Sequence, residues 1–216
     1  MKLREISDDL FYVGFLKRKR MGAVFMRFYA HYENPRFQGK VFTQKQFERW
    51  FKNNTEEGRN LDAKFSKLVG GFDIPSYVFS PFFEGKFDPL SREEKELLNE
   101  VDKIGKQDFF VISSLFKEKQ NKQHEIVHGL YYLNEDYKIE INEFLKNINK
   151  KDYVEFEQKM RDQEIYAEFK IVDEVQANLI SYYEFFLNKN YSNWDCLPKY
   201  NKKITSIFDK YWKNKY

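Results

Sequence analysis

Two of the few histidines in this chain stand at a spacing that suits a metal ion. His124 and His128, two of three histidines, enclose a glutamate in the sequence His-Glu-Ile-Val-His. On an α-helix, residues at this spacing lie about 40° apart around the axis and roughly 6 Å apart along it. Both imidazoles can therefore reach one ion from the same helix face. Neutral imidazole is a good ligand for Zn²⁺, so the motif predicts a zinc site that includes His124 and His128.

Glu125, inside the same motif, suits a different task. On a helix it points about 100° away from His124, which makes it a poor metal ligand. It could still reach a water molecule at the metal, where it would act as general base. Ile126 and Val127 are apolar and would anchor this helix in a core. The structural alternative is a histidine pair on a helix surface that binds no metal.

A catalytic zinc usually takes a third protein ligand, and no third histidine follows closely downstream. His31 lies far upstream, and we expect an ordinary structural role for it. Glu174 is the better candidate, because it lies on a predicted helix whose apolar stripe includes Val175 and Leu179. The small residue Ala177, further along, would let a neighbouring helix approach. On spacing alone, a solvated helix carboxylate is an equally good interpretation of Glu174.

Residues 124–132, followed by residues 173–177, resemble the gluzincin type of zincin metallopeptidases. In those enzymes a HExxH helix is followed by a later helix that supplies a glutamate ligand. The wider pattern resembles a family of uncharacterised zincin-like proteins from microbes and their viruses. This second resemblance is carried by residues 32–42, 71–76 and 85–90.

The resemblance implies Zn²⁺ ligation by His124, His128 and Glu174, with Glu125 as the base. Metal-bound ligands usually have hydrogen-bonding partners that fix their orientation. The candidates for such partners are Asp173, Asn178 and Asp136.

The resemblance also suggests a role for residues 109–116. In zincins a sheet edge beside the active-site helix binds extended peptide as an added strand. An ordinary core strand is an equally good interpretation of this segment. Catalysis would also need a donor for the oxyanion. The tyrosines that could supply it are Tyr131, Tyr132, Tyr182 and Tyr183.

Apolar periodicity and capping signals predict an α+β fold that is predominantly α-helical. Strand patterns cover residues 10–16 and 109–116. Residues 72–87 hold two prolines and a glycine among large apolar residues, and we expect a packed extended loop there. The remaining segments have helical patterns: from Met21 to the stop at Asn34-Pro35, after the capping boxes at Thr43 and Ser91, and over 121–133, 135–148, 152–163, 168–187 and 202–213.

We expect a single domain over residues 1–216, zincin-like, with a small central sheet and a helical C-terminal half. Its N-terminal part, residues 1–106, would hold helices and the packed loop. Its C-terminal part, residues 107–216, would hold the strand, the HExxH helix and the helical metal-binding part.

Charge and composition exclude some classes of partner. The 37 basic and 34 acidic residues leave a net charge of +3, which argues against a strongly charged nucleic-acid or membrane-surface protein. A solvated turn is the favoured interpretation of the densest basic run, which consists of Lys17, Arg18, Lys19 and Arg20. The single cysteine, Cys196, excludes an intrachain disulfide and a multi-cysteine metal site. Without a long apolar run or a signal-peptide pattern, we expect no membrane partner and a cytoplasmic location.

The functional prediction is a zinc-dependent hydrolase, a peptidase that acts on peptide or protein through metal-activated water. The alternative is a non-catalytic, zinc-stabilised interaction or nucleic-acid-associated module, in which a fourth protein ligand would close the zinc site. A third possibility is a degenerate zincin fold without metal. The sequence carries no signal for an oligomeric state.

Overall fold

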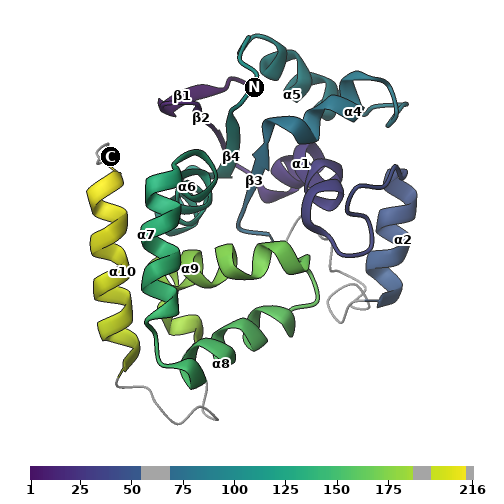
Figure 1. Ribbon diagram of the computed structural model, residues 1–216. Helices are drawn as coiled ribbons and strands as arrows, with labels where there is room; N and C mark the ends of the chain where they lie inside the picture. The colour runs from purple at the N-terminus through teal and green to yellow at the C-terminus, as the bar shows by residue number, and fades with distance from the viewer. Residues whose placement is uncertain (55–68, 187–195, 213–216) are drawn as a thin grey trace. The chain divides into compact units, whose positions relative to one another are not determined.

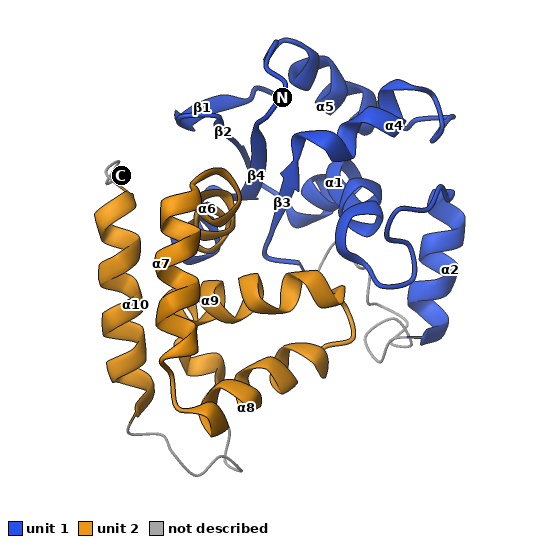
Figure 2. Cartoon of the chain, in the orientation of Figure 1, with its two compact units in different colours: residues 1–122 blue, residues 123–216 orange. Residues whose placement is uncertain are grey.

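The computed structural model describes residues 1–54, 69–186 and 196–212. The chain divides into two compact units, Met1–Lys122 and Gln123–Tyr216 (Figure 2). The first unit combines a four-stranded sheet with helices, and the described part of the second is helical (Figure 1). The predicted α+β class, with helix predominating, is therefore confirmed. The zincin-like architecture and the single domain stay predictions.

The sheet of the first unit is mixed. Its strands are β1 (Arg4–Ser7), β2 (Leu10–Phe15), β3 (Gly71–Pro75) and β4 (Phe110–Leu115), in the order β1-β2-β4-β3. β2 pairs with β4 in parallel, whereas the β1–β2 and β3–β4 pairs are antiparallel. Because β2 and β3 occupy both edges of β4, the prediction that residues 109–116 offer a free edge to a peptide is wrong. The strand also belongs to the first unit, whereas the sequence grouped it with the C-terminal part.

One face of this sheet packs against α1 (Arg18–Glu33). The ring of Phe25 on α1 stacks on that of Phe72 on β3, with centroids 5.4 Å apart. Arg27, also on α1, is buried and forms a two-pronged ion pair with Glu94, through Nε at 2.6 Å and Nη2 at 2.5 Å. Such pairs satisfy both charges inside an apolar core.

The first unit contains further helices around α1. They are α2 (Gln44–Asn54), the short α4 (Ser80–Phe83) and α5 (Arg92–Asp102). Both predicted capping boxes form: Ser91 with Glu94 before α5, and Thr43 with Gln46 before α2.

The prediction of a packed loop over residues 72–87 is wrong. This segment contains most of β3, a 3-10 helix, η2 (Ser76–Phe79), and α4. Gly71 and Pro75 stand at the two ends of β3, where they do not interrupt its ladder. Pro81 lies in the first turn of α4, where its missing N–H costs no helical hydrogen bond. β1 was not predicted, because its polar sequence shows no apolar alternation.

In the second unit, α9 is enclosed by other helices. The helical segments are α6 (Lys119–Leu133, whose first residues belong to the first unit), α7 (Glu135–Lys146), α8 (Lys150–Arg161), η3 (Glu168–Lys170), α9 (Ile171–Ser181), η4 (Tyr183–Phe186) and α10 (Leu197–Tyr211). α9 packs against α8 and α10, and α10 also contacts α7. Every residue of α9 except Val172 is buried. Its polar side chains therefore need partners inside the protein.

The helix predicted over residues 168–187 is broken in two places. η3 precedes α9, and α9 ends at Ser181 because Tyr182 leaves the helical conformation, with φ −141° and ψ 40°. Asn201, from α10, donates hydrogen bonds to two carbonyls of the last turn of α9. This contact between distant segments stabilises the helix end and could not be seen in the sequence. The predicted end at residue 187 lies outside the described residues.

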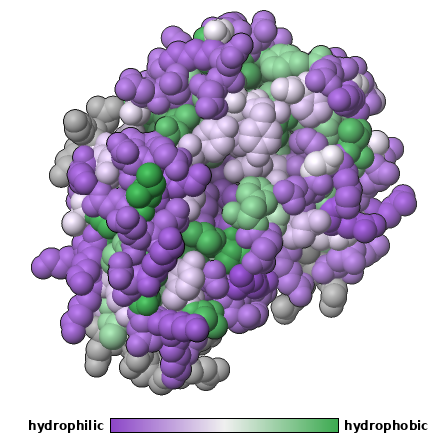
Figure 3. All heavy atoms as spheres, in the orientation of Figure 1, coloured by the Kyte–Doolittle hydropathy of each residue, from purple (hydrophilic) through white to green (hydrophobic). Residues whose placement is uncertain are grey.

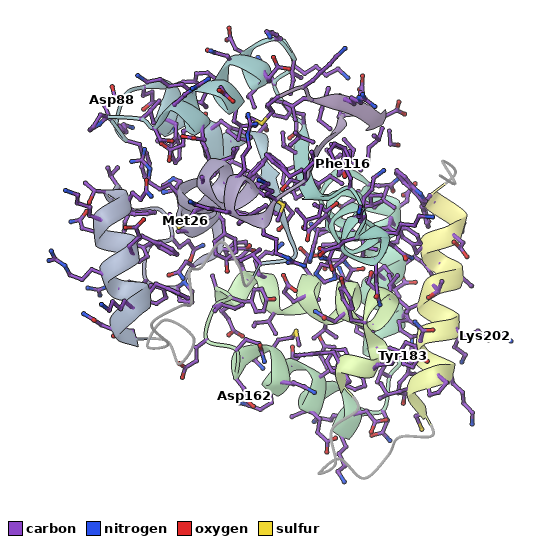
Figure 4. All side chains as sticks on the ribbon, turned by 180° about the vertical axis from the view of Figure 1, so that it is seen from behind. Met26, Asp88, Phe116, Asp162, Tyr183 and Lys202 are labelled. Atoms are coloured by element: carbon purple, nitrogen blue, oxygen red, sulfur yellow. The ribbon has the colours of Figure 1, made fainter. Side chains whose placement is uncertain are left out.

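The last helix begins earlier than the predicted range of 202–213. α10 starts at Leu197, with Pro198 in its first turn, where proline is well tolerated. Its exposed face includes Lys202 (Figure 4), while Phe208 is buried. Residue 213 is not among the described residues.

None of the helices in the described segments is both long and apolar enough to cross a membrane. Figure 3 shows hydrophilic residues over most of the visible face, with smaller groups of apolar residues between them. Phe116, which follows β4, is one of the exposed large apolar side chains (Figure 4).

The basic run at the start of α1 is partly neutralised within the first unit. Arg18 pairs with Glu118 and donates a hydrogen bond to the carbonyl of Val69, and Arg20 pairs with Glu96 at 3.1 Å. Within the described residues, Lys17 and Lys19 are the cations of the run for which no ion pair is seen.

Candidate metal centre

α6 and α9 bring three potential ligands together within the second unit. His124 and His128 stand one turn apart on α6, and Glu174 lies in the first turn of α9. The Nε2 atoms of the two histidines are 3.1 Å apart. Oε1 of Glu174 is 3.5 Å from Nε2 of His128, and its Oε2 is 3.8 Å from Nε2 of His124. The alternative of a solvated Glu174 is excluded, because its side chain is only 3% exposed.

The spacing of these donor atoms fits a zinc ion. With Zn–N distances of about 2.0–2.1 Å, a tetrahedral ion holds two nitrogens about 3.3 Å apart. The observed separation of 3.1 Å is close to this. Two imidazoles and one carboxylate also form a donor set typical of catalytic zinc. The side chain of His128 is 1% exposed and that of His124 is 13% exposed, so both rings are largely buried.

Asp173 sets the orientation of His128. Its Oδ1 lies 2.8 Å from Nδ1 of His128. A proton on Nδ1 is favoured by this carboxylate, which leaves a lone pair on Nε2 for a metal. The structure thus places Asp173, one of the predicted supporting residues, against His128.

Asp173 is itself held by two other side chains of the second unit. Lys170 Nζ donates to its Oδ2 at 2.7 Å, and Gln176 Nε2 donates to its Oδ1 at 2.9 Å. The hydroxyl of Tyr137 donates in turn to Oε1 of Gln176 at 3.0 Å. Burial alone would raise the pKa of Asp173, but the charges of His128 and Lys170 outweigh it and hold this pKa below its ordinary value.

The other two predicted supporting residues differ in their placement. Asn178 Nδ2 donates to the backbone carbonyl of Glu174 at 2.9 Å and to its Oε2 at 3.3 Å. The structure thus places Asn178 against the carboxylate of Glu174, and its role at a metal stays a prediction. Asp136 is exposed in the first turn of α7 and makes no hydrogen bond or ion pair to the three potential ligands within the described residues.

The environment of His124 favours its neutral form. Burial of the ring, followed by the nearby charge of His128, lowers the pKa of His124 well below its ordinary value. A neutral imidazole is the form that binds metal. The ring of Tyr182 lies beside it, with centroids 5.3 Å apart.

Glu125 is buried on α6, next to His124 in the chain. Among the tyrosines considered as oxyanion donors, Tyr182 has its ring beside that of His124. Tyr131 donates instead to Asn142 Oδ1 at 2.8 Å, and burial, assisted by the charge of Asp173, raises the pKa of Tyr131 to about 12. His31 lies in the first unit, with Nδ1 3.0 Å from the carbonyl of Lys40.

Sequence reasoning did not identify Lys170, Gln176 or Tyr137. The only available signal was the spacing of Lys170 and Asp173, because opposite charges three residues apart on a helix commonly pair. That spacing does not reveal burial, and burial makes this pair unusual.

No match to this chain was found among protein-family models, curated proteins or solved structures. The interpretation of the centre therefore rests on its own geometry, and the resemblance to gluzincins stays a prediction.

Proposed function

We propose that this protein is a zinc-dependent hydrolase, a peptidase with the gluzincin type of ligand set His124, His128 and Glu174. One observation carries the proposal: two imidazole Nε2 atoms and a buried carboxylate converge within 3.8 Å of one another. At such distances either a shared proton or a bound cation relieves the repulsion between lone pairs and negative charge, and one dication would satisfy all three groups at once. Asp173 strengthens the case, because it favours the histidine tautomer that ligation needs.

The number of ligands favours a catalytic site over a structural one. In the described part of the chain, no fourth histidine, cysteine or carboxylate joins this group of three. Structural zinc sites usually have four protein ligands, whereas catalytic sites keep one position open for water or substrate. This favours a hydrolase over the zinc-stabilised interaction module. The ion pairs of Arg18 and Arg20 likewise do not favour a nucleic-acid surface.

When bound, Zn²⁺ would polarise the scissile carbonyl and lower the pKa of a water molecule. Glu125 is the residue that we assign as general base, since it follows His124 on α6 and is 6% exposed. Its carboxylate would accept the proton of the attacking water and pass it to the leaving amine. Asp173 and Asn178 would keep the histidine and the glutamate in their ligating orientations.

The experiment combines metal analysis with peptide hydrolysis. We expect about one zinc per chain in the purified protein, its loss in His128→Ala, and cleavage of peptides from a mixed fluorogenic library. Glu125→Gln should retain zinc and lose about 10²-fold or more in turnover. Glu135→Gln, an exposed substitution on α7, is the matched control and should behave like the wild type. Full activity of Glu125→Gln would refute the mechanism, and a zinc-free, inactive wild type would refute the function.

A further inference from the structure

Lys170 is a fully buried lysine beside the candidate metal centre. It is 1% exposed and ends η3, directly before α9. Lysine is almost never fully buried unless its charge is paired. Its Nζ lies 2.7 Å from Oδ2 of Asp173, while the other oxygen of that carboxylate faces His128. The ammonium group of Lys170 therefore reaches His128, a potential metal ligand, through one intervening side chain, that of Asp173.

The charges around the centre show what this lysine does. Asp173 and Glu174 are neighbouring buried carboxylates, and the ammonium group of Lys170 lies 2.7 Å from Oδ2 of Asp173. Removing Lys170 would take one positive charge away from this pair of buried carboxylates. Loss of one partner from a buried ion pair strongly destabilises a protein. Lys170 thus supplies positive charge whether or not a metal is bound.

We propose that Lys170 is a positioning residue that acts as an internal counter-ion: it keeps Asp173 and His128 in place without metal, and it weakens zinc binding. This inference rests on the proposed zinc site. Because the positive charge of Lys170 is paired with one of these carboxylates, a dication at the site keeps a larger net positive charge than it would without the lysine. A larger net positive charge polarises a bound carbonyl more strongly. The same charge makes the site bind the metal less tightly.

The test compares zinc affinities, measured by competition with a chromophoric chelator, and thermal unfolding of the zinc-free proteins. Lys170→Gln removes the charge but keeps a donor for Asp173, and Lys170→Arg keeps the charge. Lys159→Gln is the matched control, since Lys159 is a half-buried lysine of the same unit that bonds to the carbonyl of Phe185 instead. We expect Lys170→Gln to bind zinc at least about tenfold more tightly and to unfold at a lower temperature without zinc. Lys170→Arg and Lys159→Gln should bind zinc as the wild type does.

The sign of the change separates this role from a purely structural one. A structural lysine would lower zinc affinity when replaced, so equal or weaker binding by Lys170→Gln overturns the inference. Failure of Lys170→Gln to fold even in saturating zinc overturns it as well, whereas folding only with zinc supports it. If the wild type binds zinc and Lys170→Gln does not bind it more tightly than the wild type, the inference about Lys170 is refuted but the proposed function is not. If the wild type binds no zinc, the proposed function falls with it.

Discussion

Replacing Asp173 by asparagine should destabilise the zinc-free protein severely. The substitution keeps the shape of the side chain but removes the charge that faces Lys170 at 2.7 Å. Breaking a buried ion pair by removing one partner costs about 3–5 kcal/mol. The asparagine oxygen can still accept a hydrogen bond from Lys170, so we expect about 3 kcal/mol, at the lower end of this range. With a urea dependence of about 2 kcal/mol/M, the unfolding midpoint would fall by about 1.5 M.

The assay is urea unfolding of zinc-free protein, followed by far-UV circular dichroism. Asp162→Asn serves as the control, because Asp162 is exposed at the end of α8 (Figure 4) and its loss should change stability by about 0.5 kcal/mol or less. The double variant Lys170→Met with Asp173→Asn should regain most of the loss, since removing both partners leaves no uncompensated charge. A shift below about 0.5 kcal/mol for Asp173→Asn would refute the reasoning. So would a double variant less stable than Asp173→Asn alone.

Three further predictions concern pH, packing and metal removal. Because the folded state holds the pKa of His124 below its ordinary value of 6.5, the unfolded chain takes up this proton first. The stability of zinc-free protein should therefore fall as pH drops below about 6.5, by up to about 1.4 kcal/mol per pH unit from this group; urea titrations at pH 7.5 and 5.5 should show a weaker dependence in His124→Asn. Phe72→Ala, at a side chain 1% exposed, should cost about 3–5 kcal/mol in the same assay, whereas Phe83→Ala, at 50% exposure, should cost far less. Zinc at about 100 times its Kd should add about 2.7 kcal/mol, so a chelator should lower the Tm of the wild type and leave that of His128→Ala unchanged.

The part of the centre that lies on one helix was predictable from the sequence. Residues four apart on α6 must share a face, so the convergence of His124 and His128 follows from local geometry. Glu174 was chosen because the apolar stripe beside it indicates a buried helix. The contact of Glu174 with α6 is a tertiary contact, and residue spacing does not specify it. The same limit applies to Asp136, whose position near the motif in sequence does not bring it to the ligands.

The fold was predictable where periodicity is strong. Helices with clear caps, such as the one after Ser91, form as expected. β3 was missed because Pro75, in the segment over residues 72–87, was interpreted as a breaker, although it stands at the end of the strand. The end of α9 was missed because a side chain of α10, Asn201, satisfies its carbonyls. In each case contacts distant in sequence outweighed the local signal.

The parallel pairing of β2 with β4 affects how this chain can fold during synthesis. The pair joins residues a hundred positions apart, such as Phe15 and Leu115. At about 5–20 residues per second, the ribosome needs about 5–20 s to make the second strand after the first. During that interval the apolar sequence of β2 has no parallel neighbour. Nascent or truncated chains that stop before Leu115 should therefore aggregate or require a chaperone, rather than accumulate as a folded first unit.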